Sequence, residues 1–264
     1  MLLVMIDVDF GRRSEDYAKY RPGFPESFYD RVESYVALNG TRAVDLGTGP
    51  GIVAIELAKR GATVTGVDIS QNQINAARDR AAKADVADRC TFVVAPAENT
   101  TLPAGEFDLV TAGQCWGWFD EPVVLREVDR LLRPGGWLIV PQDCYLPRLD
   151  DVARATERLI LQHNPDWTMA DFDGLYPQRI DALIEGGFQF VEQFCYDHHR
   201  PFTHEAWRGR IRTCNGVGSG SMSKSQVEQF DAALAELLRN EFTHEPLMIR
   251  HRVWVVIVRK PNST

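Results

Sequence analysis

Three glycines at alternate positions, Gly47, Gly49 and Gly51, lie between a short apolar segment and a helical pattern. Glycine adopts positive φ without strain and has no Cβ, so such a turn bends sharply and lets the backbone approach a ligand. Asp68 ends the next apolar segment, 21 residues after Gly47. In a βαβ unit, an acid at this distance accepts hydrogen bonds from ribose hydroxyls. The spacing predicts a site for a nucleoside-like ligand.

The elements that position these residues follow from the same stretch. Residues 43–46 predict a short buried strand, and residues 51–60 predict a helix that stops at Gly61. Residues 63–67 predict a second strand with Asp68 at its carboxyl end. This order of strand, glycine turn, helix and strand is typical of a βαβ unit.

The form of the glycine turn argues against a dinucleotide. A pyrophosphate needs open N–H groups at a helix N-terminus and the spacing G-x-G-x-x-G, but here the glycines run G-x-G-x-G and Ile52 takes the third position. Pro50 removes one N–H group. Asp45 would repel phosphate but attract a ligand that carries a sulfonium and an ammonium. The residues therefore favour S-adenosylmethionine, with a nicotinamide-dependent oxidoreductase as the disfavoured alternative.

With these residues in place, VDLGTGPG followed by GVDIS resembles the cofactor motifs of class I S-adenosylmethionine-dependent methyltransferases. AENTTLP at 97–103 is similar to the family's adenine-binding turn, and FDLVTAGQCWGWFD at 107–120 to its fourth strand and substrate-side loop. LLRPGGWLIV at 131–140 is similar to the helix end and fifth strand. Within the family the chain most resembles type 11 methyltransferase domains of the trans-aconitate methyltransferase-like or ubiquinone-type small-molecule group.

The resemblance implies a doubly wound, Rossmann-like α/β fold. It has a seven-stranded, mostly parallel sheet, helices on both faces and a helical insertion after the fifth strand, and its last strand, expected at 251–259, runs antiparallel. The alternation of strands and helices agrees with this fold. Asp120 and Pro122 predict one of the helix starts, because they supply an N-cap oxygen and a fixed φ.

One methyltransferase domain is expected over residues 1–264. We divide it into a lid segment, a cofactor-binding core, a helical insertion over the pocket and a C-terminal substrate-side part of the sheet, at 1–36, 37–145, 146–188 and 189–264.

Charge and cysteine usage narrow the partners. The net charge of −8 disfavours nucleic acid and leaves a small-molecule substrate. The five cysteines form no C-x-x-C pair, which fits a reducing compartment and predicts a cytoplasmic protein. The apolar N-terminal run carries Asp7 and no basic residue, so neither a signal peptide nor a membrane span is expected. We expect a monomer or homodimer.

The cofactor contacts are expected from the turn, from Asp68 and from the family's motifs. Asp68 would bind the ribose diol, with capping of the next helix as its alternative role. The resemblance implies that Ile69 flanks adenine and that Ala97 and Glu98 form the adenine turn, although Pro96 replaces the acid that many relatives carry. Glu98 or water would then take the amino-group contact, or Glu98 is only exposed. The expected cofactor-binding residues are Arg21, Asp45, Gly47, Thr48, Gly49, Gly51, Asp68, Ile69, Ala97, Glu98 and Gln114.

Arg21 lies in an N-terminal segment similar to the one that covers the cofactor in this family. The guanidinium of Arg21 would pair with the methionine carboxylate of the cofactor. Alternatively, Arg21 caps the end of a helix, because it directly precedes Pro22. Tyr17 shares a helical side with Arg21 and is expected near the substrate.

The acceptor is expected at the loop after the fourth strand. Trp116 and Trp118 would form a water-excluding wall, unless they only pack in the core. Arg208 and Arg212 share a helical face and would clamp an anion, although a solvated surface face is the more ordinary reading. The proposed substrate-binding residues are Tyr17, Trp116, Trp118, Arg208 and Arg212.

No catalytic residue is assigned. Relatives often carry a histidine where this chain has Gly117, which favours an acidic acceptor that ionises unaided. We expect O-methylation of a carboxylate or phenol by in-line displacement, with C- or N-methylation, or a catalytically silent adenosylmethionine-binding module, as alternatives. Adjacent His198 and His199 would point to opposite faces of a strand, so no metal site is expected.

Overall fold

The computed structural model describes residues 19–218 and 222–262. The chain divides into two compact units. We call the first the helical unit; it comprises Met1–Pro22, Cys144–Gly174 and Asp197–Arg252. We call the second the sheet unit; it comprises Gly23–Asp143, Leu175–Tyr196 and Val253–Thr264. Tyr17 lies outside the described residues.

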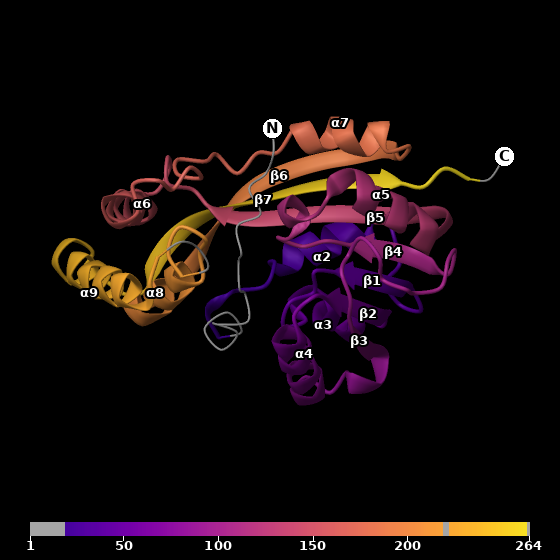
Figure 1. The fold of residues 1–264 in the computed structure, drawn as a ribbon, viewed down its shortest axis with the longest axis horizontal. Helices are drawn as coiled ribbons and strands as arrows, with labels where there is room; N and C mark the ends of the chain where they lie inside the picture. The colour runs from indigo at the N-terminus through magenta and orange to yellow at the C-terminus, as the bar shows by residue number, and fades with distance from the viewer. Residues whose placement is uncertain (1–18, 219–221, 263–264) are drawn as a thin grey trace. The chain divides into compact units, whose positions relative to one another are not determined.

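Seven strands form one sheet in the order β3-β2-β1-β4-β5-β7-β6 (Figure 1). β1 pairs in parallel with β2 and β4, and the parallel ladder continues from β2 to β3 and from β4 to β5. The predicted doubly wound sheet is therefore confirmed. The strands are β1 (Arg42–Leu46), β2 (Thr63–Asp68), β3 (Cys90–Val94), β4 (Phe107–Thr111), β5 (Leu132–Tyr145), β6 (Gln189–Phe202) and β7 (Leu247–Arg259).

β7 runs antiparallel to β5. The N–H of Gly135 donates to the carbonyl of Lys260 (3.1 Å), and the N–H of Leu146 donates to the carbonyl of Arg250 (3.0 Å). As the residue number on the β5 side increases from 135 to 146, that of the partner on the β7 side decreases from 260 to 250. Only an antiparallel pair allows this. The predicted direction is confirmed, and the strand begins at Leu247 rather than at residue 251.

Helices follow most strands, and several begin at side-chain caps. Ser70 caps α4, and Asp120 caps α5 by accepting a hydrogen bond from the N–H of Val123 (3.4 Å). The helix start predicted at Asp120 and Pro122 is therefore confirmed. The helices are α2 (Glu26–Glu33), α3 (Ile52–Lys59), α4 (Gln71–Lys83), α5 (Glu121–Leu131), α6 (Asp151–His163), α7 (Gln178–Glu185), α8 (His204–Arg212) and α9 (Lys224–Glu241), with 3₁₀ turns at η2 (Ala87–Arg89) and η3 (Trp116–Trp118).

The sheet unit contains two apolar cores, because neighbouring residues of a strand point to opposite faces. Leu109 of β4 joins the core that also contains residues of α2, α3 and α4. Val110 joins the other core, together with Val124 of α5 and Leu183 of α7. Helices thus cover both faces of the sheet, as expected.

The segment predicted as one helical insertion, 146–188, is divided between the units. α6 belongs to the helical unit, where it shares a core with α8 and α9. There the indole N–H of Trp207 donates to the hydroxyl of Thr156 (3.0 Å). α7 belongs to the sheet unit, because Leu183 and Phe188 pack in its second core. Within the described residues, every helix is too short or too polar to cross a membrane.

Candidate functional site at the carboxyl edge of the sheet

The glycine turn directly follows β1 and needs glycine for two reasons. Gly47, Gly49 and Gly51 have φ values of 59°, 54° and 78°, in the left-handed region that other residues adopt at a cost. A Cβ on Gly47 would also lie 2.8 Å from the Sγ atom of Cys115. The turn therefore adopts this conformation, and packs against Cys115, only with glycine at these positions.

Asp68 ends β2 and faces the turn. One carboxylate oxygen accepts a hydrogen bond from the N–H of Gly49 (2.9 Å), and the other accepts from the N–H of Ser70 (2.8 Å). Burial raises the pKa of Asp68, and these two N–H groups oppose the shift. A carboxylate has about four acceptor positions, so a ribose diol can still bind to the two that remain. Ser70 rather than Asp68 caps α4, and the ribose contact of Asp68 stays a prediction that this geometry allows.

Asp45 lies beneath the turn and is 1% exposed. Its two oxygens accept hydrogen bonds from the hydroxyls of Thr48 and Thr111, each at 2.7 Å. Burial raises the pKa of Asp45 to about 6, although both threonines oppose the shift. The structure thus gives Asp45 and Thr48 a positioning role, and their direct contact with a cofactor stays a prediction.

The residues expected around adenine lie at the ends of β2 and β3. Ile69 is 74% exposed, while Ala97 is buried. Glu98 is half-buried, and its carboxylate accepts a hydrogen bond from the backbone N–H of Asp120 (3.0 Å). Glu98 therefore ties the turn after β3 to the start of α5, and its contact with adenine stays a prediction.

The loop after β4 joins the carboxyl ends of three strands. Gln114 has φ of 66°, and its side-chain amide donates to the carbonyl of Asp143 at the end of β5. The thiol of Cys115 donates to the carbonyl of Leu46 at the end of β1 (3.1 Å). Holding a residue other than glycine at such a φ costs about 1–3 kcal/mol and is frequent at functional sites.

The two tryptophans of this loop differ. Trp116 is 2% exposed, and its indole N–H donates to Glu121 (2.6 Å), so it packs in the core as its alternative role required. Trp118 is 43% exposed. The role of Trp118 as a wall for an acceptor stays a prediction, and Trp116 instead fixes the loop to α5.

Arg21 binds within the helical unit. Its Nε and Nη2 groups donate to the hydroxyl and carbonyl of Thr213, both at 3.0 Å. This contact differs from the expected one with the carboxylate of the cofactor, which stays a prediction.

Arg208 and Arg212 share one face, as their spacing indicates, but that face already holds an anion. Both guanidinium groups pair with Asp231 of α9, and the Arg212 contact measures 2.9 Å. Burial would raise the pKa of Asp231, but its hydrogen bonds with the two arginines outweigh burial and lower it. Asp231 therefore partly neutralises the positive charge of the two arginines that were predicted to clamp an anionic substrate.

Arg179 is a charged residue at this edge that the sequence reasoning missed. Its Nη2 atom lies 3.7 Å from the position that a Cβ on Gly117 would take. The guanidinium lies over the ring of Tyr176, 4.2 Å from the centroid. Arg179 is far from Gly117 in sequence, so no spacing rule links them. A helical insertion was predicted over 146–188 with no helix start near Arg179, so no local pattern singled out this residue.

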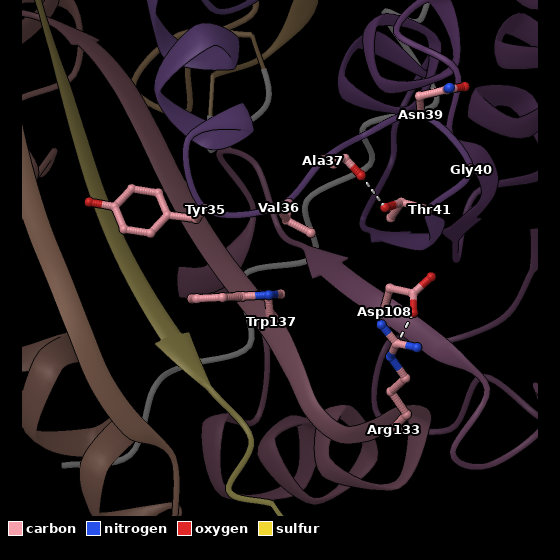
Figure 2. A pocket seen from close by; sticks show the side chains of 9 residues that line it. All are labelled: Tyr35, Val36, Ala37, Asn39, Gly40, Thr41, Asp108, Arg133 and Trp137. Atoms are coloured by element: carbon pink, nitrogen blue, oxygen red, sulfur yellow. Dashed lines mark hydrogen bonds and ion pairs between the residues drawn. The ribbon is translucent and has the colours of Figure 1, made fainter.

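A different pocket, of about 380 Å³, lies at the opposite edge, at the amino ends of β1, β4 and β5 (Figure 2). Figure 2 shows the side chain of Arg133 pointing toward Asp108, and the two form an ion pair at 2.7 Å. Ligands of doubly wound folds bind at the carboxyl ends of the strands, so the cofactor is expected at the other edge of the sheet. Its lining residues are Tyr35, Val36, Ala37, Asn39, Gly40, Thr41, Asp108, Arg133 and Trp137.

In the part of the chain that the structure describes, no cluster of three or more histidine, cysteine, aspartate or glutamate residues is placed to hold a metal ion.

The glycine turn after β1, the acid that ends β2 and the loop after β4 define a doubly wound α/β protein with a candidate ligand site at the carboxyl edge. Residues 44–140 match the family described as "Methyltransferase domain". The 27-O-demethylrifamycin SV methyltransferase of Amycolatopsis mediterranei is 37% identical over 221 residues, which are 82% of this chain and 78% of that protein. The chain belongs to the class I S-adenosylmethionine-dependent methyltransferases.

Other relatives match over a shorter stretch. Methyltransferase GfsG of Streptomyces halstedii is 36% identical over 132 residues, 49% of this chain and 46% of that protein. The match spans about half the length of the first curated relatives. Among solved structures, a candidate type II methyltransferase from Anaeromyxobacter dehalogenans is similar at a TM-score of 0.64 and 23% identity, over 92% of this chain and all of that one. This likeness shows the fold.

Proposed function

We propose that the chain transfers a methyl group from S-adenosylmethionine to an acidic oxygen, a carboxylate or a phenol, of a small molecule. The observation that carries the cofactor assignment is Asp68, held opposite the glycine turn by its bond to Gly49 with acceptor positions left for a ribose diol. When bound, the cofactor supplies a methyl group already activated on a sulfonium. The protein then has to orient the acceptor and exclude water.

The turn and its neighbours fit this cofactor. Pro50 lacks an N–H group, so the turn offers fewer hydrogen-bond donors to a phosphate. The exposed side chain of Ile69, next to Asp68, offers an apolar contact for adenine. Ala97, Glu98 and Gln114 complete the proposed cofactor contacts in the sheet unit. A solved geranyl diphosphate C-methyltransferase from Streptomyces coelicolor, with S-adenosyl-L-homocysteine in its complex, has a related fold at a TM-score of 0.52, with 16% identity over 89% of this chain and 76% of that one.

An acidic acceptor is favoured because the loop after β4 offers no base. Among residues 114–118, only Cys115 titrates, and burial raises its pKa well above the ordinary value. The thiol therefore stays protonated at neutral pH and cannot take a proton from the acceptor. A carboxylate or an acidic phenol needs no such help.

O-methylation is favoured over N-methylation of an ammonium and C-methylation of a C–H acid by the same argument, because both acceptors must first lose a proton. A ubiquinone biosynthesis O-methyltransferase of Paracidovorax citrulli is 36% identical over 111 residues, 40% of this chain and 45% of that protein. A ubiquinone/menaquinone biosynthesis C-methyltransferase of Geobacter sulfurreducens is 35% identical over 105 residues, 38% of this chain and 41% of that protein, so the choice of oxygen rests on the missing base and not on these relatives.

We also propose that the protein acts in a reducing compartment such as the cytoplasm. All five cysteines, which lie within the described residues, are free thiols, and free thiols persist where glutathione keeps them reduced.

Calorimetry tests the cofactor, and labelled methyl transfer tests the reaction. S-adenosylmethionine and S-adenosylhomocysteine should bind, and NADH should not; the reverse result would overturn the cofactor assignment. With methyl-labelled cofactor and a panel of carboxylates and phenols, the product should carry label on oxygen. Mild alkali then releases label from a carboxyl ester but not from a phenol ether, and fragmentation in a mass spectrometer exposes C- or N-methyl products. Cofactor binding without methyl transfer to any acceptor would contradict the proposed reaction and favour the alternative, a catalytically silent adenosylmethionine-binding module.

A further inference from the structure

We propose that Arg179 binds the anionic group of the acceptor and thereby sets the specificity of the enzyme. This inference rests on the proposed function, because it needs an acceptor with a negative charge. The ligand chemistry is that of a carboxylate, which a guanidinium binds through two parallel N–H groups.

Contacts inside the sheet unit place Arg179 at the reacting edge. The Sγ atom of Cys115 would lie 2.8 Å from a Cβ on Gly47, so the loop after β4 packs directly on the glycine turn. Gly117 follows Cys115 by two residues in this loop, and the Nη2 atom of Arg179 lies 3.7 Å from the position that a Cβ on Gly117 would take. The positive charge of Arg179 also acts on the buried Cys115 thiol, whose pKa it lowers against the larger effect of burial. One short loop thus connects the cofactor turn to this guanidinium.

The position of Arg179 is unfavourable for a purely structural cation. It lies in the first turn of α7, which also contains Asp181, and Pro177, the N-cap residue, provides no side-chain hydrogen bond there. The positive end of the helix dipole repels a cation and attracts an anion. An anionic acceptor bound by Arg179 would relieve this repulsion.

The ring of Tyr176 holds the guanidinium in place. The Cζ atom of Arg179 lies 4.2 Å from the ring centroid, within the range of a cation–π contact. Tyr176 packs edge-on against Trp254 at 5.5 Å, and Trp254 is 2% exposed. A guanidinium held by a ring that is itself fixed in the core loses little entropy when it binds an anion.

Gly117 and Arg179 form a matched pair. A Cβ at position 117 would fit, but a longer side chain such as histidine would compete with the guanidinium for the same space. Arginine stays protonated at physiological pH and cannot act as a base. Where a histidine would deprotonate an acceptor, this pair instead selects an acceptor that is already ionised.

The test is binding to the protein saturated with S-adenosylhomocysteine, using 3,4-dihydroxybenzoate and its methyl ester as probes. We expect Arg179→Met to weaken binding of the acid about 10- to 100-fold, the loss of a charged hydrogen bond. Binding of the ester should not change. Arg179→Lys should restore part of the loss, and Arg42→Met, which removes an exposed arginine at the amino end of β1, should change nothing.

Each contrary result has a distinct meaning. Equal loss for acid and ester, or no loss for either, would overturn the proposal, as would a wild-type protein that does not bind the acid. The cofactor's own carboxylate is the other source of the same anion. Weaker binding of S-adenosylhomocysteine by Arg179→Met, with unchanged binding of 5′-methylthioadenosine, would assign Arg179 to that carboxylate and overturn the proposal. Binding of the acid without methyl transfer would contradict only the proposed function.

Discussion

At the scale of single residues, the site depends on carboxylates that already accept hydrogen bonds from other groups of the protein. Asp68 accepts hydrogen bonds from Gly49 and Ser70, so the same group that would bind ribose also fixes the turn and the start of α4. Asp45 is more deeply buried and accepts hydrogen bonds from the hydroxyls of Thr48 and Thr111. The two acids therefore differ in role, although both lie near the carboxyl ends of adjacent strands.

Asp68→Ala should weaken binding of S-adenosylhomocysteine by about 2–4 kcal/mol, roughly 30- to 1000-fold, because two charged hydrogen bonds to the ribose are lost. Calorimetry measures this change, with Asp79→Ala on the exposed side of α4 as the control. Unchanged affinity in a folded Asp68→Ala protein would remove the ribose assignment.

Asp45 should make the stability of the protein depend on pH. Its pKa is raised from 3.8 to about 6 in the folded state, so protonation favours folding. This stabilisation is complete below about pH 4 and is lost as pH rises through 6, and two pKa units correspond to about 3 kcal/mol. Asp45→Asn lacks this titration. Urea unfolding from pH 4 to 7.5 should show the free energy of unfolding of wild type fall by about this amount relative to the variant; parallel profiles would contradict the expectation.

At the scale of elements, α5 connects the adenine-side turn to the loop after β4. The N–H of Thr100 donates to Glu127 (2.9 Å), and Arg130 donates to the same carboxylate (2.7 Å). At the start of the helix, Glu98 accepts from the N–H of Asp120. Residues 98–100 are thus held by one helix, which positions the turn without any ligand.

Glu127→Gln should destabilise the protein by about 2 kcal/mol at pH 7, since it removes the charge that Arg130 and Thr100 stabilise. Burial would raise the pKa of Glu127, but the hydrogen bonds from Arg130 and Thr100 outweigh it and lower the pKa to about 2. The carboxylate therefore stabilises the fold above its ordinary pKa of 4.5, and this contribution is lost as pH falls through 2. Denaturant unfolding at pH 7 and pH 3 should show the difference from wild type shrink in acid. Glu106→Gln, which breaks an exposed ion pair, is the control and should have little effect.

Local signals explain which elements could be predicted. The start of α5 follows from Asp120 and Pro122, which act within one turn, and the turn after β1 follows from its glycines. The assignment of α7 to the sheet unit depends on Leu183 packing against residues distant in sequence. The same holds for Asp231, which pairs with Arg208 and Arg212 from another helix. No periodicity encodes such contacts.

At the scale of the whole molecule, the cofactor motifs all lie in the sheet unit, while Arg21 and the Arg208–Arg212 pair lie in the helical unit. The sequence predicted one domain with a covering insertion because its motifs follow one another without a linker. The division into units depends instead on which core each segment enters, and β5, β6 and β7 each pass through both.

Ligand binding should therefore protect the sheet unit at a few defined places. At 100 times its Kd, S-adenosylhomocysteine stabilises the folded state by about 2.7 kcal/mol, and hydrogen exchange of amides at 47–51, 68–70 and 97–99 should slow most. 5′-Methylthioadenosine carries the same ribose and adenine without the amino-acid part. It should protect 68–70 and 97–99 in the same way and protect 47–51 less, since the methionine portion is expected beside the glycine turn. Protection at residues 35–41 instead would move the ligand to the pocket at the amino ends of the strands and contradict the site.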